Sequence, residues 1–427
     1  MLQTLKYNSR GTNVELLQLA LTRAGLFNDD IDGIFGKKTL ESVKDFQTAN
    51  GLKADGIVGD KTWAKLMPYI NGYTTIKIGK GDTFWSLANK YGTSVKAIST
   101  ANPDTEPLNL KIGEELTIPF GFSLVPTSIN YSYFLLQNIL EGLAKRYPFI
   151  TLFSIGKSVM GKNIYALKIG RGSTEIFYNA SFHANEWITT PVLLNFAEQY
   201  LNAYATGGKI NGLSAFALYN MATLYIVPMV NPDGVDLVNG VMENSQYYIR
   251  AKRYASKYPS IPFPSGWKAN INGTDLNLQF PAEWEQAKRI KYQQGFTSPA
   301  PRDFVGFSPL SESESQAIYN FTLNHSFALI LAYHTQGEII YWKFLDYQPP
   351  RSYEIALIMQ KSSGYSLEET PYNSAFAGYK DWFIQQYNLP GYTIECGLGE
   401  NPLPVSQFDK IYKDNLPILT TGITQAI

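Results

Sequence analysis

The sequence has little or none of several features that mark common protein classes. Cysteine occurs once, at Cys396, which excludes a framework of intramolecular disulfides. The longest apolar run, near Phe327–Tyr333, is far shorter than the roughly 20 residues that a membrane-spanning helix needs. The first ten residues lack the apolar stretch of a secretory signal, so we expect none. Lysine plus arginine equals aspartate plus glutamate at 36 each, so no net charge favours nucleic acid or an anionic membrane as a partner. No obligate protein partner is indicated either.

What is present predicts a soluble multidomain protein. The chain has 427 residues, of which 44% are hydrophobic, and this length suggests two or three domains. Residues 1–70 contain an internal repeat, in which Asp32-Gly-Ile-Phe-Gly-Lys-Lys-Thr39 returns as Asp55-Gly-Ile-Val-Gly-Asp-Lys-Thr62. Apolar residues at helical intervals precede and follow these turns, which predicts a small three-helix unit. It resembles the peptidoglycan-binding domain of many cell-wall hydrolases.

Residues 73–120 predict a second small module. A strand at Thr75–Ile78 is followed by Gly81-Asp82-Thr83, which suits a turn and a helix N-cap. A second helix ends before Pro103, and a closing strand is expected over Glu115–Ile118. This βααβ pattern resembles a LysM domain, a family that binds glycans containing N-acetylglucosamine, including peptidoglycan.

Residues 127–427, after a short linker, predict an α/β domain with a mixed central sheet, because strand-like and helix-like segments alternate. The expected strands are Glu175–Asn179, Ala222–Val227, Phe327–Tyr333 and Tyr392–Glu395, and the expected helices are Tyr131–Tyr147, Pro191–Ala205, Glu312–Asn324 and Tyr353–Ser363.

Histidine is scarce, and two of the three histidines stand at strand ends. His183 follows a predicted strand and has Glu186 three residues later, so both side chains can hold one ion. His334 closes another strand. Open α/β sheets place their sites at the carboxyl ends of strands, and two histidines plus one glutamate are an established set of ligands for catalytic zinc. We therefore predict one Zn²⁺ held by His183, Glu186 and His334.

Glu395 ends a further apolar strand, where a carboxylate is costly without a partner. Peptide hydrolysis at zinc also needs a base that takes the proton of the attacking water and returns it to the leaving amine. We assign this role to Glu395.

The segment from about residue 130 onward resembles the zinc carboxypeptidases. The resemblance rests on six motifs in order: His183-x-x-Glu186, Asn231-Pro-Asp-Gly234, Thr274-Asp-Leu-Asn277, His334-Thr-Gln-Gly337, Lys380-Asp-Trp382 and Thr393-Ile-Glu395. The arrangement is closest to the γ-D-glutamyl-diamino acid endopeptidases of spore-forming bacteria, which carry LysM modules ahead of this domain. It implies cleavage between D-glutamate, through its γ-carboxyl, and meso-diaminopimelate.

Two departures from the family pattern bear on function. Carboxypeptidases bind the substrate's terminal carboxylate with an Asn and an Arg, and here Asn277 is followed by Leu278, which cannot form that bidentate contact. Related enzymes have an Asn-x-Arg-Gly motif whose arginine polarises the scissile carbonyl. In this chain Asn272 stands at the position of that arginine. Either zinc holds the oxyanion, with Asn272 as an uncharged donor, or another cation such as Lys268, Arg250 or Arg253 reaches the site.

The resemblance also implies substrate-binding residues. Lys380, just before the pair that begins with Asp381, is expected at the base of the pocket that sets specificity, where it would meet the extra carboxylate of diaminopimelate. Tyr372 matches, within one residue, a mobile tyrosine that covers the substrate.

The predicted function is therefore hydrolysis of the γ-D-glutamyl–meso-diaminopimelate bond in peptidoglycan stem peptides. Two alternatives remain: a zinc carboxypeptidase for proteins or other wall peptides, and a non-catalytic peptidoglycan-binding protein. Glycan and stem peptides are the expected partners. The expected location is the cytoplasm of the sporulating cell, or the cell wall or spore after release.

Overall fold

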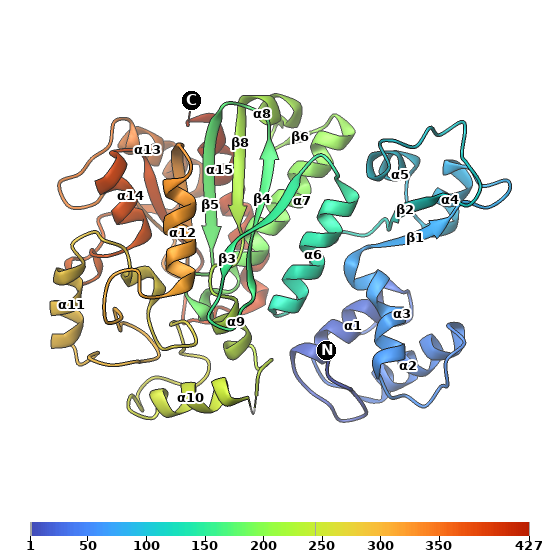
Figure 1. The fold of residues 1–427 in the computed structure, drawn as a ribbon, viewed down its shortest axis with the longest axis horizontal. Helices are drawn as coiled ribbons and strands as arrows, with labels where there is room; N and C mark the ends of the chain where they lie inside the picture. The colour runs from blue at the N-terminus through green and yellow to red at the C-terminus, as the bar shows by residue number, and fades with distance from the viewer. Residues whose placement is uncertain (1, 244, 427) are drawn as a thin grey trace. The chain divides into compact units, whose positions relative to one another are not determined.

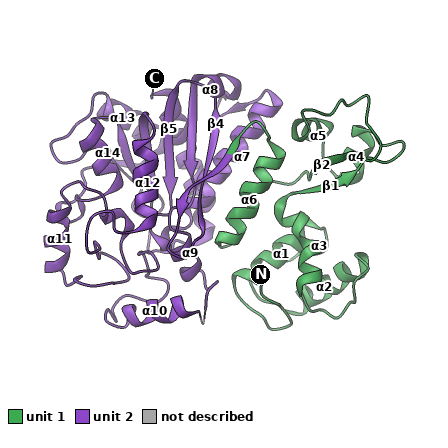
Figure 2. Ribbon diagram, viewed as in Figure 1, with its two compact units in different colours: residues 1–151 green, residues 152–427 purple. Residues whose placement is uncertain are grey.

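The computed structural model describes residues 2–243 and 245–426 and divides into two compact units, residues 1–151 and 152–427 (Figure 2). The division lies beyond the predicted start of the third domain at residue 127, and the domain boundaries given above stay predictions. Among the described residues no helix is long and apolar enough to cross a membrane.

The three-helix module consists of α1 (Thr12–Arg23), α2 (Lys37–Ala49) and α3 (Asp60–Asn71) (Figure 1). The repeat seen in the sequence is a repeated hydrogen-bond network. The buried Gln18 donates to Asp32 Oδ1 (2.8 Å) and accepts from Gly33 N (2.9 Å). Gln47 makes the same two contacts with Asp55 and Gly56. Each glutamine therefore anchors one copy of the turn to the preceding helix.

The second module has the predicted βααβ order: β1 (Tyr73–Lys77), α4 (Phe84–Tyr91), α5 (Val95–Ala101) and β2 (Glu115–Pro119), with β1 and β2 antiparallel. Thr83 caps α4 as expected, since its hydroxyl accepts from Ser86 N. Helix α6 (Tyr133–Arg146) belongs to the same unit. The guanidinium of Arg146 donates to the carbonyls of Gly72 and Phe122, so the segment expected to be a linker is bound to this helix.

The second unit is built on an eight-stranded mixed sheet with the order β11-β10-β12-β9-β5-β8-β4-β3. The bounds of its strands are β3 (Thr151–Lys157), β4 (Asn163–Gly170), β5 (Thr174–Ala180), β8 (Ala222–Val227), β9 (Phe327–His334), β10 (Ile339–Tyr341), β11 (Ser366–Glu368) and β12 (Gly391–Glu395). All four strands predicted from the sequence are present, and β12, β9, β5 and β8 are consecutive and parallel.

Helices cover both faces of this sheet (Figure 1). They include α7 (Thr189–Thr206), α12 (Ser313–Leu323), α13 (Ser352–Ser363), α14 (Tyr379–Tyr387) and α15 (Phe408–Thr424). The unit also contains the helices α8 (Ala215–Met221), α9 (Pro232–Val238), α10 (Gln246–Ala255) and α11 (Trp284–Gln293). Its short elements are the 3-10 turns η1 (Ala184–Glu186), η2 (Leu276–Leu278), η3 (Tyr372–Ser374) and η4 (Val405–Gln407) and a hairpin of β6 (Lys209–Ile210) and β7 (Leu213–Ser214).

Adjacent residues of β5 show how the two layers are specified. Phe177 contacts the rings of Phe321 on α12 and Tyr379 on α14. Tyr178 points to the opposite face, where its hydroxyl donates to the carbonyl of Leu419 on α15 (2.7 Å). Since side chains alternate along a strand, a continuous apolar run buries both faces of the sheet.

The parallel strands bring the predicted catalytic residues to one edge of the sheet. His183 lies three residues beyond the end of β5, and His334 ends the neighbouring strand β9. Glu395 ends β12 and lies directly opposite His334 in the ladder. Because β5, β9 and β12 run parallel, their carboxyl ends meet and the three side chains converge.

Candidate active site

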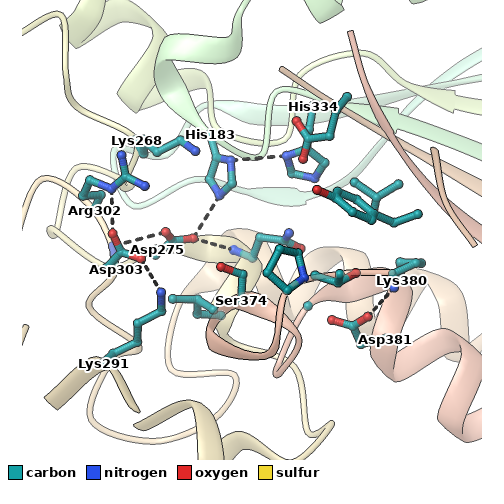
Figure 3. Close-up of a pocket in the computed structure, with 18 residues that line it drawn as sticks. His183, Lys268, Asp275, Lys291, Arg302, Asp303, His334, Ser374, Lys380 and Asp381 are labelled. Carbon is teal, nitrogen blue, oxygen red and sulfur yellow. Dashed lines mark hydrogen bonds and ion pairs between the residues drawn. The ribbon is translucent and has the colours of Figure 1, made fainter. Parts of the chain in front are cut away.

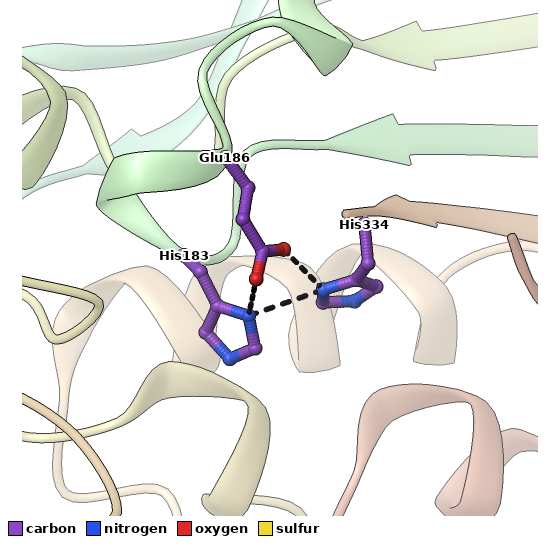
Figure 4. Close-up of side chains that lie close together, drawn as sticks. All are labelled: His183, Glu186 and His334. Carbon is purple, nitrogen blue, oxygen red and sulfur yellow. Dashed lines mark hydrogen bonds and ion pairs between the residues drawn. The ribbon is translucent and has the colours of Figure 1, made fainter. Parts of the chain in front are cut away.

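His183, Glu186 and His334 form a compact cluster of possible metal ligands, with ligand atoms within 4.8 Å of one another (Figure 4). Glu186 Oε1 lies 2.9 Å from His183 Nδ1, and its Oε2 lies 3.0 Å from His334 Nδ1. The two Nδ1 atoms are 3.2 Å apart. All three residues are buried. Each residue thus turns a lone-pair atom toward one shared point.

These separations suit a zinc ion. Zinc–nitrogen and zinc–oxygen bonds of about 2.0–2.1 Å in a tetrahedron place the ligand atoms about 3.3 Å apart. The charges around the cluster also favour a cation. Burial acts to lower the pKa of His183, yet the carboxylates of Glu186 and Asp275 raise it to about 9. The carboxylates of Glu186 and Asp275 therefore favour a positive charge at the point where the three ligand atoms meet.

The ligand atoms are held by a second set of contacts. His183 Nε2 lies 3.1 Å from Oδ1 of the buried Asp275. The backbone N–H of Thr335 donates to Glu186 Oε2 (3.2 Å). Asn401 donates to the carbonyl of Thr335 (3.0 Å) and accepts from its hydroxyl (2.7 Å). Such outer contacts fix the orientation and the tautomer of metal ligands.

Glu395 lines the same pocket as the two histidines. Burial, reinforced by the negative charge of Glu186, raises the pKa of Glu395 to about 8. A carboxyl group whose pKa lies near neutrality suits a base that must take up a proton and release it again. Glu395 therefore stays the candidate general base.

Of the three cations left open by the sequence, Lys268 is the one that lines the pocket. Its Nζ lies 2.9 Å from Glu186 Oε1, and the side chain is mostly buried. Arg250 instead donates to Asn272 Oδ1 (2.9 Å), and Arg253 lies over the ring of Tyr254. Asn272 itself donates to Glu312 (2.9 Å) and is not among the residues that line the pocket. We therefore replace Asn272 with Lys268 as the candidate oxyanion-binding residue.

The other predicted substrate-binding residues are divided between the pocket and its surroundings. Asn277, Lys380 and Asp381 line the pocket. Asn277 Oδ1 accepts from Tyr379 N (3.0 Å), which leaves its amide N–H groups for a ligand. Lys380 forms an ion pair with Asp381 (2.6 Å) and donates to the carbonyl of Lys343 (2.7 Å). Tyr372 is 62% exposed and lines an adjacent depression instead.

Asp275 and Arg302 are two of the pocket residues that sequence reasoning missed. Asp275 stands in the Thr274–Asn277 motif, two residues before the expected substrate-binding residue Asn277. This position could have identified Asp275 as a pocket residue from the sequence. Arg302 lies in a loop, with Nε 2.6 Å from Asp303 Oδ2, and follows no strand and no recognisable motif (Figure 3). Leu278 lines the pocket where the family pattern has an arginine.

Family models match nearly the whole chain in three consecutive parts. Residues 10–66 match a putative peptidoglycan binding domain, residues 76–119 a LysM domain, and residues 136–418 a zinc carboxypeptidase. The fold agrees with this. Carboxypeptidase A from Helicoverpa armigera aligns with a TM-score of 0.53 and 18% identity over 98% of each chain. Thrombin activatable fibrinolysis inhibitor aligns with a TM-score of 0.54 and 16% identity, over 74% of this chain and 89% of its own.

Two curated bacterial proteins are more similar in sequence. Gamma-D-glutamyl-L-diamino acid endopeptidase 1 of Lysinibacillus sphaericus is 46% identical over 301 residues, which are 70% of this chain and 74% of that protein. The uncharacterized protein YqgT of Bacillus subtilis is 42% identical over 276 residues, 64% of this chain and 72% of that one. The convergent His-Glu-His cluster, the fold and these matches lead to one conclusion: the chain belongs to the zinc carboxypeptidase family.

Proposed function

We propose that the protein hydrolyses the γ-D-glutamyl–meso-diaminopimelate bond of peptidoglycan stem peptides. The observation that carries this proposal is the pocket itself, which joins a His-Glu-His cluster and the half-buried Glu395 to the cations Lys268 and Lys380. The 46% identity to a γ-D-glutamyl-L-diamino acid endopeptidase supports the choice of bond.

His183, Glu186 and His334 would hold the zinc ion, which when bound supplies a Lewis acid that acidifies water and polarises the scissile carbonyl. Glu395 takes a proton from the attacking water as the oxygen forms its bond to the carbonyl carbon. Lys268 then stabilises the negative charge that develops on the carbonyl oxygen. Glu395 passes the proton to the amine nitrogen as the carbon–nitrogen bond breaks. The carboxylate is thereby regenerated for the next cycle.

Lys380 is the proposed contact for the distal carboxylate of diaminopimelate. Its ammonium has three N–H donors, of which Asp381 and the Lys343 carbonyl engage two. The third is available to an anionic ligand in the pocket. Asn277 offers its side-chain amide from the adjoining wall. Leu278, by contrast, offers no group that forms a forked contact with a carboxylate, so trimming of ordinary protein C-termini is disfavoured.

The two N-terminal modules support a substrate within the cell wall. By family, one is a peptidoglycan-binding domain and the other a LysM domain. Attachment to the glycan would keep the catalytic unit near stem peptides and raise their effective concentration without new contacts in the active site. We propose that the protein acts on the wall or on fragments derived from it.

A panel of three peptides tests this function against its alternatives. The peptides are γ-D-glutamyl-meso-diaminopimelate, its α-linked isomer, and a protein-like peptide with a free C-terminal leucine. The zinc-loaded protein should cleave the first and leave the other two intact. Cleavage of the protein-like peptide would favour the carboxypeptidase alternative. Cleavage of none, together with retained binding to peptidoglycan, would favour a non-catalytic binding protein.

A further inference from the structure

The charges in the pocket are unevenly neutralised, and the excess lies away from Lys380. At one end Lys380 is paired with Asp381, one cation with one carboxylate. At the other end Arg302 and Lys291 share a single carboxylate, that of Asp303 (2.6 and 2.7 Å). All five side chains line the pocket. In the trio of Arg302, Lys291 and Asp303 two cations thus share one carboxylate, and the neighbouring carboxylate of Asp275 is engaged by His183 and by the N–H of Asp303.

In Figure 3 Arg302 lies to one side of His183 and Lys380 to the other. The Arg302 end is connected to the cluster by a chain of contacts. Asp303 N donates to Asp275 Oδ2 (3.2 Å), and Asp275 Oδ1 accepts from His183 Nε2 (3.1 Å). A peptide whose diamino acid occupies the Lys380 end would therefore place its acyl group toward Arg302.

The guanidinium of Arg302 is suited to bind an anion there. Its Nε is engaged by Asp303, and the side chain remains 45% exposed on the pocket wall. Arginine presents donors in a planar fork that matches a carboxylate, and it stays charged at all working pH values. Lys291, only 8% exposed, holds Asp303 from the other side and so fixes the carboxylate to which Arg302 is anchored.

We propose that Arg302 binds the free α-carboxylate of the γ-linked glutamyl residue, on the acyl side of the scissile bond. This inference rests on the proposed function. A γ-linked glutamate differs from an ordinary peptide residue because its α-carboxylate is a charged group at the far end of the acyl chain. Arg302 thus supplies recognition of the γ-linkage itself, while Lys380 recognises the residue that leaves.

The test compares the binding of two peptides that differ at one group. L-Ala-γ-D-Glu-meso-diaminopimelate carries the α-carboxylate, and its D-isoglutamine analogue carries an amide in the same place. Dissociation constants are measured by calorimetry with the zinc-loaded Glu395→Gln protein, which binds without turnover. We expect the carboxylate peptide to bind about 10- to 100-fold more tightly, the range for a hydrogen bond to a charged group.

Arg302→Gln in the same background should weaken binding of the carboxylate peptide by about 10- to 100-fold. Binding of the amide peptide should change by no more than about threefold. Arg302→Lys should retain part of the preference, since it keeps the charge and loses the fork. Arg289→Gln is the matched control, because Arg289 is exposed on α11 and contacts Gln286. It should leave the ratio of the two constants unchanged.

Two results would overturn the inference. One is equal binding of both peptides to the parent protein. The other is an equal loss of affinity for both peptides in the Arg302→Gln protein, which would mean that Arg302 acts only through Asp303 and Asp275. Failure of the proposed function gives a different result. If the protein with Glu395 intact hydrolyses neither peptide, yet the carboxylate preference exists and depends on Arg302, the anion site stands and the catalytic proposal falls.

Discussion

Asp275 Oδ1 lies 3.1 Å from Nε2 of His183, on the side of the ring opposite the nitrogen that faces Glu186. Burial acts to raise the pKa of Asp275, but His183 and Lys268 hold it well below its ordinary value, so the side chain is an anion. A carboxylate at Nε2 requires a hydrogen on that nitrogen. The lone pair of Nδ1 is thereby directed into the proposed zinc site.

Asp275→Asn should weaken zinc binding by about 10- to 100-fold, the usual effect of losing a partner of a metal-bound histidine. An amide has only one acceptor atom, whereas Asp275 accepts from His183 with one oxygen and from Asp303 N with the other. Zinc affinity is measured by competition with a chelator. Asp346→Asn, an exposed change of the same chemistry, is the control. Equal zinc affinity in both variants would show that Asp275 does not orient His183.

Lys268→Met should lower the rate of hydrolysis by about 100- to 1,000-fold, as removal of one oxyanion donor does in other hydrolases. Binding of the ground-state peptide should change much less, because the charge on the carbonyl oxygen develops only during the reaction. Steady-state kinetics separate the two effects. Arg253→Gln, at the exposed arginine that lies over Tyr254, should retain the parent rate. A fully active Lys268→Met protein would show that Lys268 does not stabilise the oxyanion.

Lys380→Met should abolish the preference for diaminopimelate over L-lysine, which has the same side chain without the distal carboxylate. The lone charge of Asp381 would then be left buried, so the double variant Lys380→Met/Asp381→Asn is made in parallel to keep the site neutral. The ratio of kcat/KM for peptides with either residue in the third position is the readout. A preference that survives in both variants would show that Lys380 has only a structural role.

Glu314 predicts a pH dependence of stability that is separate from catalysis. This fully buried carboxyl accepts from Val159 N (3.1 Å), and burial raises its pKa to about 7. The folded protein therefore holds a proton that the unfolded chain releases near pH 4.5. The proton on Glu314 therefore contributes about 3 kcal/mol to the free energy of unfolding below pH 4.5, and this contribution is lost as the pH rises through 7.

In thermal unfolding of the zinc-loaded protein from pH 5 to 8, Glu314→Gln should remove this slope, because a glutamine does not titrate. The difference in Tm between parent and variant should shift in favour of the variant as the pH rises. Parallel curves over the whole range would show that Glu314 is already ionised in the folded protein.

Local patterns in the sequence were sufficient for the three-part fold, for the four central parallel strands and for helices α6, α7, α12 and α13, but not for β3, β4 or α15. The apolar runs of β5, β8, β9 and β12 were recognisable because buried parallel strands are continuously hydrophobic. The three-residue strands β10 and β11 were not predicted, because each is short and depends on pairing with distant segments.

In the site, too, local sequence patterns identified some residues and missed those that depend on contacts between distant segments. His183, Glu186 and His334 were found because one pair has ligand spacing and the third residue ends a strand. Lys268 was one of three cations that the sequence could not separate, since only the folded loop shows that Arg250 is engaged by Asn272. Arg302 was missed entirely. Its position in the pocket depends on contacts with Asp303 and on a loop whose course no local pattern encodes.

The most direct test of the central claim is mass spectrometry of L-Ala-γ-D-Glu-meso-diaminopimelate after incubation with the zinc-loaded protein, with Glu395→Gln as the paired control. The proposed mechanism predicts free diaminopimelate and L-Ala-D-Glu from the parent protein, and intact tripeptide from the variant at equal zinc content. Intact tripeptide in both samples, or equal release in both, would contradict the assigned bond or the assigned base.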